Sequence, residues 1–175
     1  MAIRPIRLFP DPLLSQECKP VEDFDQSLMK ILQDLIETLY HSPGVGLAAP
    51  QIGILSQVSV IDTSRSFKIR NPAAASEKQI ILINPHIESV SGSQTPREGC
   101  LSVPHLLANI QRYESVTVSY RTPKGGENKI QVRGFDALAF QHEIDHLHGK
   151  LFLDRVANLK TDIFRRKTYR KIDPN

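Results

Sequence analysis

The chain has 175 residues, 40% of them hydrophobic and 23% charged, which excludes an intrinsically disordered protein and fits one globular domain. The net charge of +3 is unevenly distributed: residues 155–175 carry seven basic and two acidic side chains, or +5, and the rest carries −2. A basic tail on a near-neutral body favours contact with an anionic partner, and a solvated helix face is the alternative interpretation.

Targeting signals and cysteine content indicate the cellular compartment in which the protein is expected. No stretch approaches the roughly 20 apolar residues of a membrane span. The N-terminal region is interrupted by Arg4, Arg7 and Pro10, unlike a secretion signal. The two cysteines, Cys18 and Cys100, cannot build a disulfide scaffold. We therefore expect a cytoplasmic protein, with neither a membrane nor DNA among its partners.

An amphipathic helix is predicted over residues 23–41, because apolar residues recur at three- and four-residue steps. Asp23 and Gln26 resemble a capping box at its start.

A glycine-rich segment, GVGLAAPQIG at residues 44–53, follows this helix. Its three glycines and one proline suit neither a regular helix nor a central strand, so they predict a loop whose backbone closely approaches another group.

The remaining predicted elements are four strands and two further helices. Gly134 introduces a helix at about residues 135–148 that is apolar on more than one side and therefore buried, and a polar third helix is predicted at about 155–171. Strands between terminal helices predict a single α+β domain over residues 1–175. The predicted strands are 57–62, 79–84, 115–120 and 129–133, with a surface excursion at 63–78 and a hairpin loop at 122–128.

The most informative segment is QHEIDHLHG, residues 141–149. His142 and His146 are four residues apart, so on a helix they lie one turn apart on one face and can bind one metal ion. Glu143 adjoins the first histidine and can handle protons on a metal-bound water. This H-E-x-x-H pattern predicts a catalytic metal site, and it leaves the third ligand open.

A third ligand is found upstream. Glutamate is absent after Glu143, and the downstream acids Asp154 and Asp162 have no special setting, so the usual metalloprotease arrangements fit poorly. Cys100, in the segment PREGCLSVP that we expect to begin a strand, offers a thiolate, a good ligand for a borderline or soft divalent ion. One cysteine and two histidines leave a fourth position for water, the pattern of a catalytic site.

Three motifs together resemble a known family. GVGLAAPQIG, EGCLS and QHEIDHLHG, in this order and at these separations, resemble the signature motifs of peptide deformylases, and RLFPDPLL and LFLDR do so as well. The resemblance covers about residues 4–160. It implies removal of the formyl group from the N-terminal formylmethionine of new polypeptides. It also implies an α+β fold in which antiparallel strands surround the helix that bears the two histidines.

The resemblance assigns roles to individual positions. Cys100, His142 and His146 match the metal ligands, and Glu143 matches the catalytic carboxylate. Gln51 matches the glutamine that, with the backbone N–H of the residue after the cysteine, stabilises the oxyanion. That residue is Leu101. The family's substrate-binding positions are matched by Val45, Gly46 and Gly99, which would pair with the peptide backbone, and by Phe135, Leu138 and Ala139, which would line the methionine pocket beside Val45.

The resemblance also implies a metal and partners. It implies one divalent ion, with Fe²⁺ expected and Zn²⁺, Ni²⁺ or Co²⁺ able to substitute, and the ligand set by itself permits zinc equally. The substrates would be N-formylmethionyl nascent peptides. In some members a C-terminal helix docks on the ribosome, a role that the basic side chains of Arg165, Arg166, Lys167, Arg170 and Lys171 would suit.

Two other functions are compatible with the motifs. Another metal-dependent amidase or a metallopeptidase is disfavoured by the upstream cysteine. A non-catalytic, metal-stabilised binding module is disfavoured by Glu143 and Gln51, which a structural metal site does not need. Among the supporting residues, we expect Glu98 to orient a metal ligand and Arg112 to pair with Asp145 or a neighbouring acid.

Overall fold

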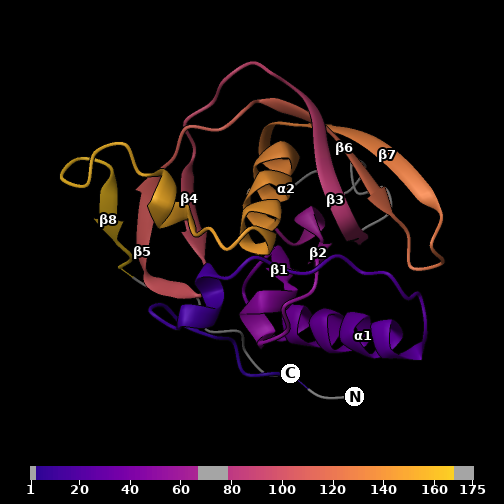
Figure 1. Cartoon of the computed structure of the whole chain (residues 1–175). Helices are drawn as coiled ribbons and strands as arrows, with labels where there is room; N and C mark the ends of the chain where they lie inside the picture. The colour runs from indigo at the N-terminus through magenta and orange to yellow at the C-terminus, as the bar shows by residue number, and fades with distance from the viewer. Residues whose placement is uncertain (1–2, 67–78, 168–175) are drawn as a thin grey trace.

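The computed structural model describes residues 3–66 and 79–167. In this part of the chain, two α-helices and two antiparallel sheets form the α+β fold expected from the sequence (Figure 1). The α-helices are α1 (Gln26–Tyr40) and α2 (Gly134–Leu147). The strands are β1 (Gly46–Ala48), β2 (Val58–Ile61), β3 (Ile80–Ser91), β4 (Arg97–Cys100), β5 (Val103–Asn109), β6 (Ser115–Arg121), β7 (Glu127–Arg133) and β8 (Ile163–Arg165).

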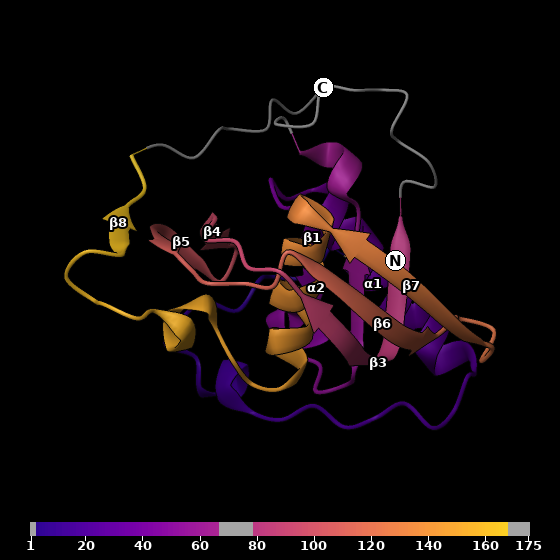
Figure 2. The same cartoon turned by 90° about the horizontal axis from the view of Figure 1, so that it is seen from above.

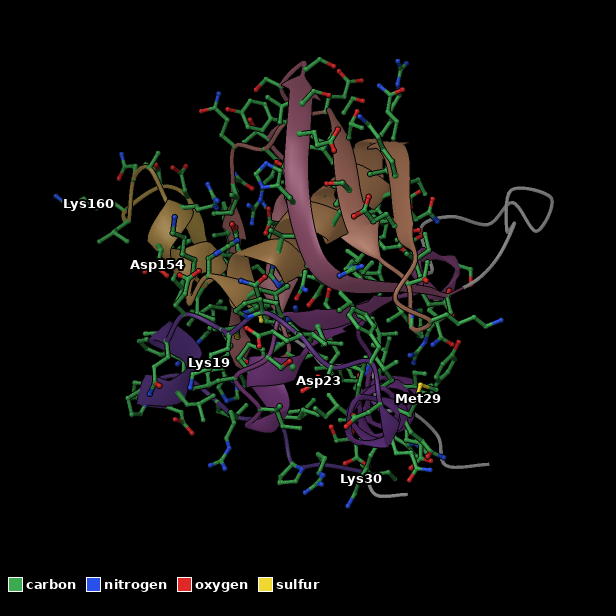
Figure 3. All side chains as sticks on the ribbon, turned by 45° about the vertical axis from the view of Figure 1, so that its right-hand side comes forward. Lys19, Asp23, Met29, Lys30, Asp154 and Lys160 are labelled. Atoms are coloured by element: carbon green, nitrogen blue, oxygen red, sulfur yellow. The ribbon has the colours of Figure 1, made fainter. Side chains whose placement is uncertain are left out.

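The larger sheet has the strand order β1-β2-β3-β6-β7, and it separates the two α-helices. Alternate residues of a strand point to opposite faces. Val60 therefore joins the core cluster with α1, and Ile61 joins the cluster with α2. Burial on both faces explains why β2 is apolar at nearly every position. Met29 and Lys30 of α1 are exposed on its outer side (Figure 3).

The smaller sheet has the strand order β4-β5-β8. In two perpendicular views α2 lies between this sheet and the larger one (Figures 1 and 2). Ten of the fourteen residues of α2 are buried, which confirms the prediction of a buried helix. β1 lies at one edge of the larger sheet and β4 at one edge of the smaller sheet, so within residues 3–66 and 79–167 each has an edge without a neighbouring strand.

The predicted C-terminal helix over 155–171 is wrong for the part that the structure describes. Residues Phe152–Arg155 form a 3-10 turn, η5, and Ile163–Arg165 form β8, which pairs antiparallel with β5. Figure 3 shows Lys160 in the connection between η5 and β8. The segment lacks an apolar face of helical period, whereas pairing with β5 satisfies its backbone groups. Residues 168–171 of the predicted helix lie outside the described residues.

Smaller corrections concern element boundaries. The N-cap of α1 is Asp25, whose carboxylate accepts hydrogen bonds from the backbone of Ser27 and Leu28; the predicted capping box at Asp23 is wrong. The predicted loop over residues 44–53 includes β1 and a 3-10 turn, η2 (Ala49–Ile52), because backbone pairing with β2 orders the segment. Most of the predicted excursion, residues 67–78, lies outside the described residues.

One strand is longer than its sequence predicts. The strand predicted over 79–84 continues in β3 past Pro85, which lacks a backbone N–H. A register shift between Ile83 and His86 accommodates the proline, and Asn84 there has a φ of +49°. The Asn84 amide exchanges two hydrogen bonds with the backbone of Val21, which fixes the N-terminal segment to the sheet.

Candidate active site

Two elements bring the predicted metal ligands together. α2 carries His142 and His146 one turn apart, with ring centroids separated by 4.9 Å. Cys100 ends β4 on the opposite side of the site; it was expected at the beginning of a strand. In the described part of the chain, these three residues form the group suited to holding a metal ion, with ligand atoms within 4.8 Å of one another.

The electrostatics of this group suit a divalent cation. Cys100 Sγ lies 3.2 Å from Nε2 of His146 and accepts a hydrogen bond of 3.4 Å from the backbone N–H of Ser102. Burial by itself would raise the pKa of the Cys100 thiol, but His146 and His142 outweigh it and hold that pKa well below its usual value. The thiolate is the form that binds a metal. The donor set therefore fits a borderline or soft divalent ion.

Glu143 lies beside these ligands with its carboxyl group buried. Its Oε2 atom has no hydrogen-bond partner among the described residues. Burial disfavours the charged form and raises the pKa of Glu143 to about 7. A Cβ on Gly46 would overlap this carboxyl group, so only glycine lets β1 approach it so closely. This contact explains one of the glycines in GVGLAAPQIG, whose predicted close approach of the backbone is confirmed here.

Gln51 is held in one orientation by its own backbone turn. The backbone N–H of Ala48 donates to Gln51 Oε1 at 2.9 Å, which turns the amide nitrogen toward the metal ligands. That nitrogen lies 3.1 Å from Ser102 Oγ and 3.4 Å from Cys100 Sγ. Gln51 is 1% exposed. A neutral hydrogen-bond donor is therefore fixed at the edge of the site.

The predicted site residues converge on one pocket. His146 is not among the residues that line it and has 1% of its surface exposed. Gly44 and Arg97 also line the pocket, and the sequence interpretation missed both. The position of Arg97, two residues before Gly99 in a strand, was the available signal, because alternate residues share a face. The predicted residues that line the pocket are Val45, Gly46, Gln51, Gly99, Cys100, Leu101, Phe135, Leu138, Ala139, His142 and Glu143.

Comparison with known proteins identifies the family. The family model described as polypeptide deformylase matches residues 3–162. The chain belongs to this family. It is 42% identical to the peptide deformylase of Syntrophobacter fumaroxidans over 98% of this chain and 97% of that protein. It is also similar to a crystal structure of a peptide deformylase from Legionella pneumophila, at 43% identity and a TM-score of 0.82, over 91% of this chain and 89% of that one.

Membership in this family establishes the activity of the protein. The enzyme is a metal-dependent hydrolase that removes the formyl group from the N-terminal methionine of nascent polypeptides. A peptide deformylase of Synechococcus elongatus, crystallised in complex with actinonin, is similar at a TM-score of 0.81 and 36% identity, over 91% of this chain and 85% of that one.

In the described part of the enzyme, no helix is long and apolar enough to cross a membrane. The cytoplasmic location stays a prediction.

A network of buried charges holds His142 in place. Its Nδ1 lies 3.0 Å from the Glu98 carboxylate, which leaves Nε2 for a metal. Arg112 donates to Glu98 at 2.6 and 3.0 Å and to Asp145 at 2.6 Å. Burial would raise the pKa of Glu98, but the hydrogen bonds from His142 and Arg112 outweigh it and lower that pKa. Both expected pairings, Glu98 with a metal ligand and Arg112 with Asp145, are confirmed.

Replacing Arg112 by methionine is expected to destabilise the enzyme by about 3–5 kcal/mol, because the change leaves the buried Glu98 carboxylate without its arginine, whereas Asp145 keeps Arg155. The side chains of Arg112 and Glu98 are each only 2% exposed, so water cannot compensate. The free energy of unfolding in urea measures the effect. Lys30→Met, at an exposed position of α1, is the control and should change that energy by less than about 0.5 kcal/mol. Equal stability of the two variants would contradict a structural role for the network.

Two other titratable residues lie outside the pocket. His148 is exposed, and its Nδ1 lies 2.6 Å from the Glu17 carboxylate. Cys18 lies outside the group of candidate ligands. It is 2% exposed, and burial raises its pKa to about 12, so it stays protonated at neutral pH.

Proposed function

We propose that this enzyme deformylates N-formylmethionyl peptides with Fe²⁺ held by Cys100, His142 and His146, and that Glu143 is its acid–base catalyst. The observation that carries the proposal is a buried Glu143 oxygen without a hydrogen-bond partner among the described residues, beside three converging candidate ligands at one pocket. A divalent ion bound there supplies a Lewis acid that polarises the formyl group and increases the acidity of water. Zn²⁺, Ni²⁺ or Co²⁺ could replace iron with the same donors.

Glu143 would accept the proton of the attacking water and deliver it to the departing amine. A pKa raised to about 7 by burial suits both steps near neutral pH, because the group is neither a very weak base nor a very weak acid there. Gly46 leaves room for the carboxyl group to remain beside the reacting atoms. Glu143 would therefore hold the proton from the attack of water until the C–N bond breaks and the amine departs.

Gln51 and the backbone N–H of Leu101 would donate hydrogen bonds to the oxygen that gains negative charge in the transition state. The amide nitrogen of Gln51 already faces the site, because Ala48 fixes the amide oxygen on the other side. A donor that is oriented before the reaction costs no reorganisation when the charge appears. Gln51→Ala would leave Leu101 as the remaining donor of this pair.

The substrate would bind as an additional strand between the free edges of β1 and β4. Val45, Gly46 and Gly99 line the pocket from these two edges. Backbone pairing of this kind depends little on the side chains of the peptide. Phe135, Leu138 and Ala139 of α2 would receive the methionine side chain, the apolar group that every formylated substrate shares.

Formate release from a formyl-Met tripeptide amide tests the proposal. We expect the anaerobically purified, Fe²⁺-loaded enzyme to release formate rapidly, and a chelator to abolish the release. An internal peptide bond in an acetylated peptide should stay intact, which separates a deformylase from a metallopeptidase. Absence of formate release from enzyme that demonstrably contains metal would overturn the proposal.

We further propose that the basic C-terminal segment contacts the ribosome. Arg165, Arg166 and Lys167 extend from β8 at the edge of the smaller sheet, and their charges suit ribosomal RNA. Arg170 and Lys171 lie outside the described residues. Charge reversal of these five residues is expected to abolish co-sedimentation with ribosomes at moderate salt. Unchanged co-sedimentation would overturn the proposal.

A further inference from the structure

We infer that residues 4–9 position the two proposed oxyanion donors, the Gln51 amide and the backbone N–H of Leu101. Residues 4–9 are called the N-terminal strap below. The inference rests on the oxyanion role proposed above for the two donors. It adds a positioning function for a segment that is not among the residues lining the pocket.

The two donors come from different parts of the fold. Gln51 lies in η2, which follows β1 of the larger sheet, whereas Leu101 follows β4 of the smaller sheet. Two donors stabilise a developing negative charge only if both are at hydrogen-bond distance from it, and a displacement of about 1 Å can cost ~10²-fold in rate. Contacts that connect the two sheets therefore control how well the donors act together.

The N-terminal strap connects the two sides of the site by main-chain hydrogen bonds. The backbone N–H of Arg7 donates to the carbonyl of Gln51 at 2.7 Å. The backbone N–H of Phe9 donates to the carbonyl of Ser102 at 2.8 Å. Ser102 directly follows Leu101 in the chain. Two donors of one short segment thus hold the backbone of one oxyanion residue and the residue next to the other.

Side-chain contacts join the same two acceptor residues inside the site. The amide nitrogen of Gln51 lies 3.1 Å from Ser102 Oγ. The backbone N–H of Ser102 donates to Cys100 Sγ at 3.4 Å, and Ser102 is fully buried. The N-terminal strap therefore supports, from outside the pocket, a pair of residues that contacts the candidate ligand thiol.

The N-terminal strap is anchored on both sides of these bonds; it is the indigo chain that runs from α1 to the smaller sheet in Figure 1. Arg4 donates from Nε to the buried Asp34 carboxylate at 2.8 Å and from its backbone N–H to Thr38 Oγ1 at 2.9 Å, both on α1. Beyond the strap, Leu14 is buried in the core cluster that contains Cys100. Anchoring at both ends means that the strap loses little further conformational entropy when it makes the two bonds.

The test compares Arg7→Pro with Arg7→Ala in the metal-loaded enzyme. Both variants lose the exposed Arg7 side chain, but only proline lacks the N–H that donates to Gln51. We expect kcat for a formyl-Met tripeptide amide to be about 5–50-fold lower in Arg7→Pro than in Arg7→Ala. This loss is smaller than the ~10²–10³-fold for complete removal of one oxyanion donor. KM should differ by less than about three-fold, because the interaction lost is one made in the transition state.

The same comparison in a Gln51→Ala background shows how the strap acts. Alanine keeps the carbonyl that accepts the bond from residue 7 and lacks the side-chain donor. We expect the ratio of kcat between Arg7→Ala and Arg7→Pro to fall below about three in this background, because there is no amide left to position. A loss of activity caused by partial unfolding would instead give the same ratio in both backgrounds.

Amide hydrogen exchange measures the positioning without catalysis. In Arg7→Pro, the backbone N–H groups of residues 49–53 and 97–103 should exchange about five-fold or more faster than in Arg7→Ala. Exchange in residues 115–133, which form β6, β7 and their connection, should be the same in both variants.

Arg4→Gln provides a second variant that leaves both strap N–H groups in place and weakens the anchor on α1. It should lower kcat by about two- to five-fold, in line with the loss of one partly exposed ion pair, and Arg4→Lys should restore part of the loss. In the Gln51→Ala background, Arg4→Gln should leave kcat nearly unchanged. This variant decides the question if Arg7→Pro does not fold.

The outcomes separate this inference from the proposed function. Equal kcat in Arg7→Pro and Arg7→Ala, or a ratio that persists in the Gln51→Ala background, would overturn the inference alone. Unchanged hydrogen exchange in residues 49–53 and 97–103 would also overturn it. If Gln51→Ala by itself kept full activity, the proposed oxyanion role would fail and the inference would fall with it. If the unmodified, metal-loaded enzyme released no formate, the proposed function itself would fail.

Discussion

Glu143→Gln is expected to lower kcat for deformylation by about 10²–10⁴-fold, because the amide has nearly the shape of the carboxyl group and cannot transfer a proton. Burial holds the pKa of Glu143 at about 7, and one of its oxygens lacks a partner among the described residues, which is costly unless the group has a function. Formate release and bound metal are measured on the same preparation. We expect the metal content to be unchanged, since Glu143 does not belong to the ligand group.

The matched control for this prediction is Glu22→Gln. Glu22 is exposed in the segment before α1, so the same chemical change is made far from the pocket. It should leave kcat within about two-fold of the unmodified enzyme. An active Glu143→Gln enzyme would contradict the acid–base role, and loss of metal together with activity would indicate that Glu143 supports the metal site instead.

Cys100→Ser is expected to weaken metal binding by more than the roughly 10–100-fold that loss of an outer-shell partner costs, and to abolish deformylation in parallel. The thiol of Cys100 has a pKa well below its usual value and provides a thiolate, whereas a serine hydroxyl stays protonated at neutral pH and is a poor ligand. Metal analysis after equilibration with a chelator of known affinity measures the effect. His146→Ala should do the same by removing the buried imidazole.

Cys18→Ser provides the matched control for the thiol. Cys18 is as buried as Cys100, but burial raises its pKa to about 12, and it lies outside the ligand group. Its replacement should lower stability without changing metal affinity. If Cys100→Ser kept the metal and the activity, the ligand assignment would be wrong. If Cys18→Ser lost the metal, the loss in Cys100→Ser would reflect general unfolding.

The proposed metal ligands could be named from the sequence because the chemistry leaves few choices, and the structure brings their ligand atoms within 4.8 Å of one another. Two histidines at a spacing of four share one face of any α-helix, whatever the rest of the fold does. The predicted buried helix followed from its apolar residues on several sides, and α2 is buried between two sheets. The role of Glu98 beside His142 was expected for a similar reason, since ligating histidines donate their second nitrogen to an acceptor.

The basic C-terminal segment shows where local patterns fail. Its charges were read correctly from the sequence, but the helix assigned to 155–171 is replaced in the described part by η5 and β8. A three-residue strand has almost no local signal, and its stability comes from the edge of β5. The same holds for β1, which the glycines of GVGLAAPQIG predicted as a loop and which pairing with β2 orders.

The sequence by itself determined the candidate ligands, the candidate acid–base carboxylate and the α+β class, because side-chain chemistry and helical period are local properties. Only the tertiary structure decided that Cys100 meets His146 across 46 positions of sequence and that Gly46 makes room for Glu143. It alone brought Arg166 over Gly99. Such contacts depend on which strand edges pair and which faces pack. The free energy that favours one arrangement comes from packing throughout the core, so no single segment of sequence encodes it.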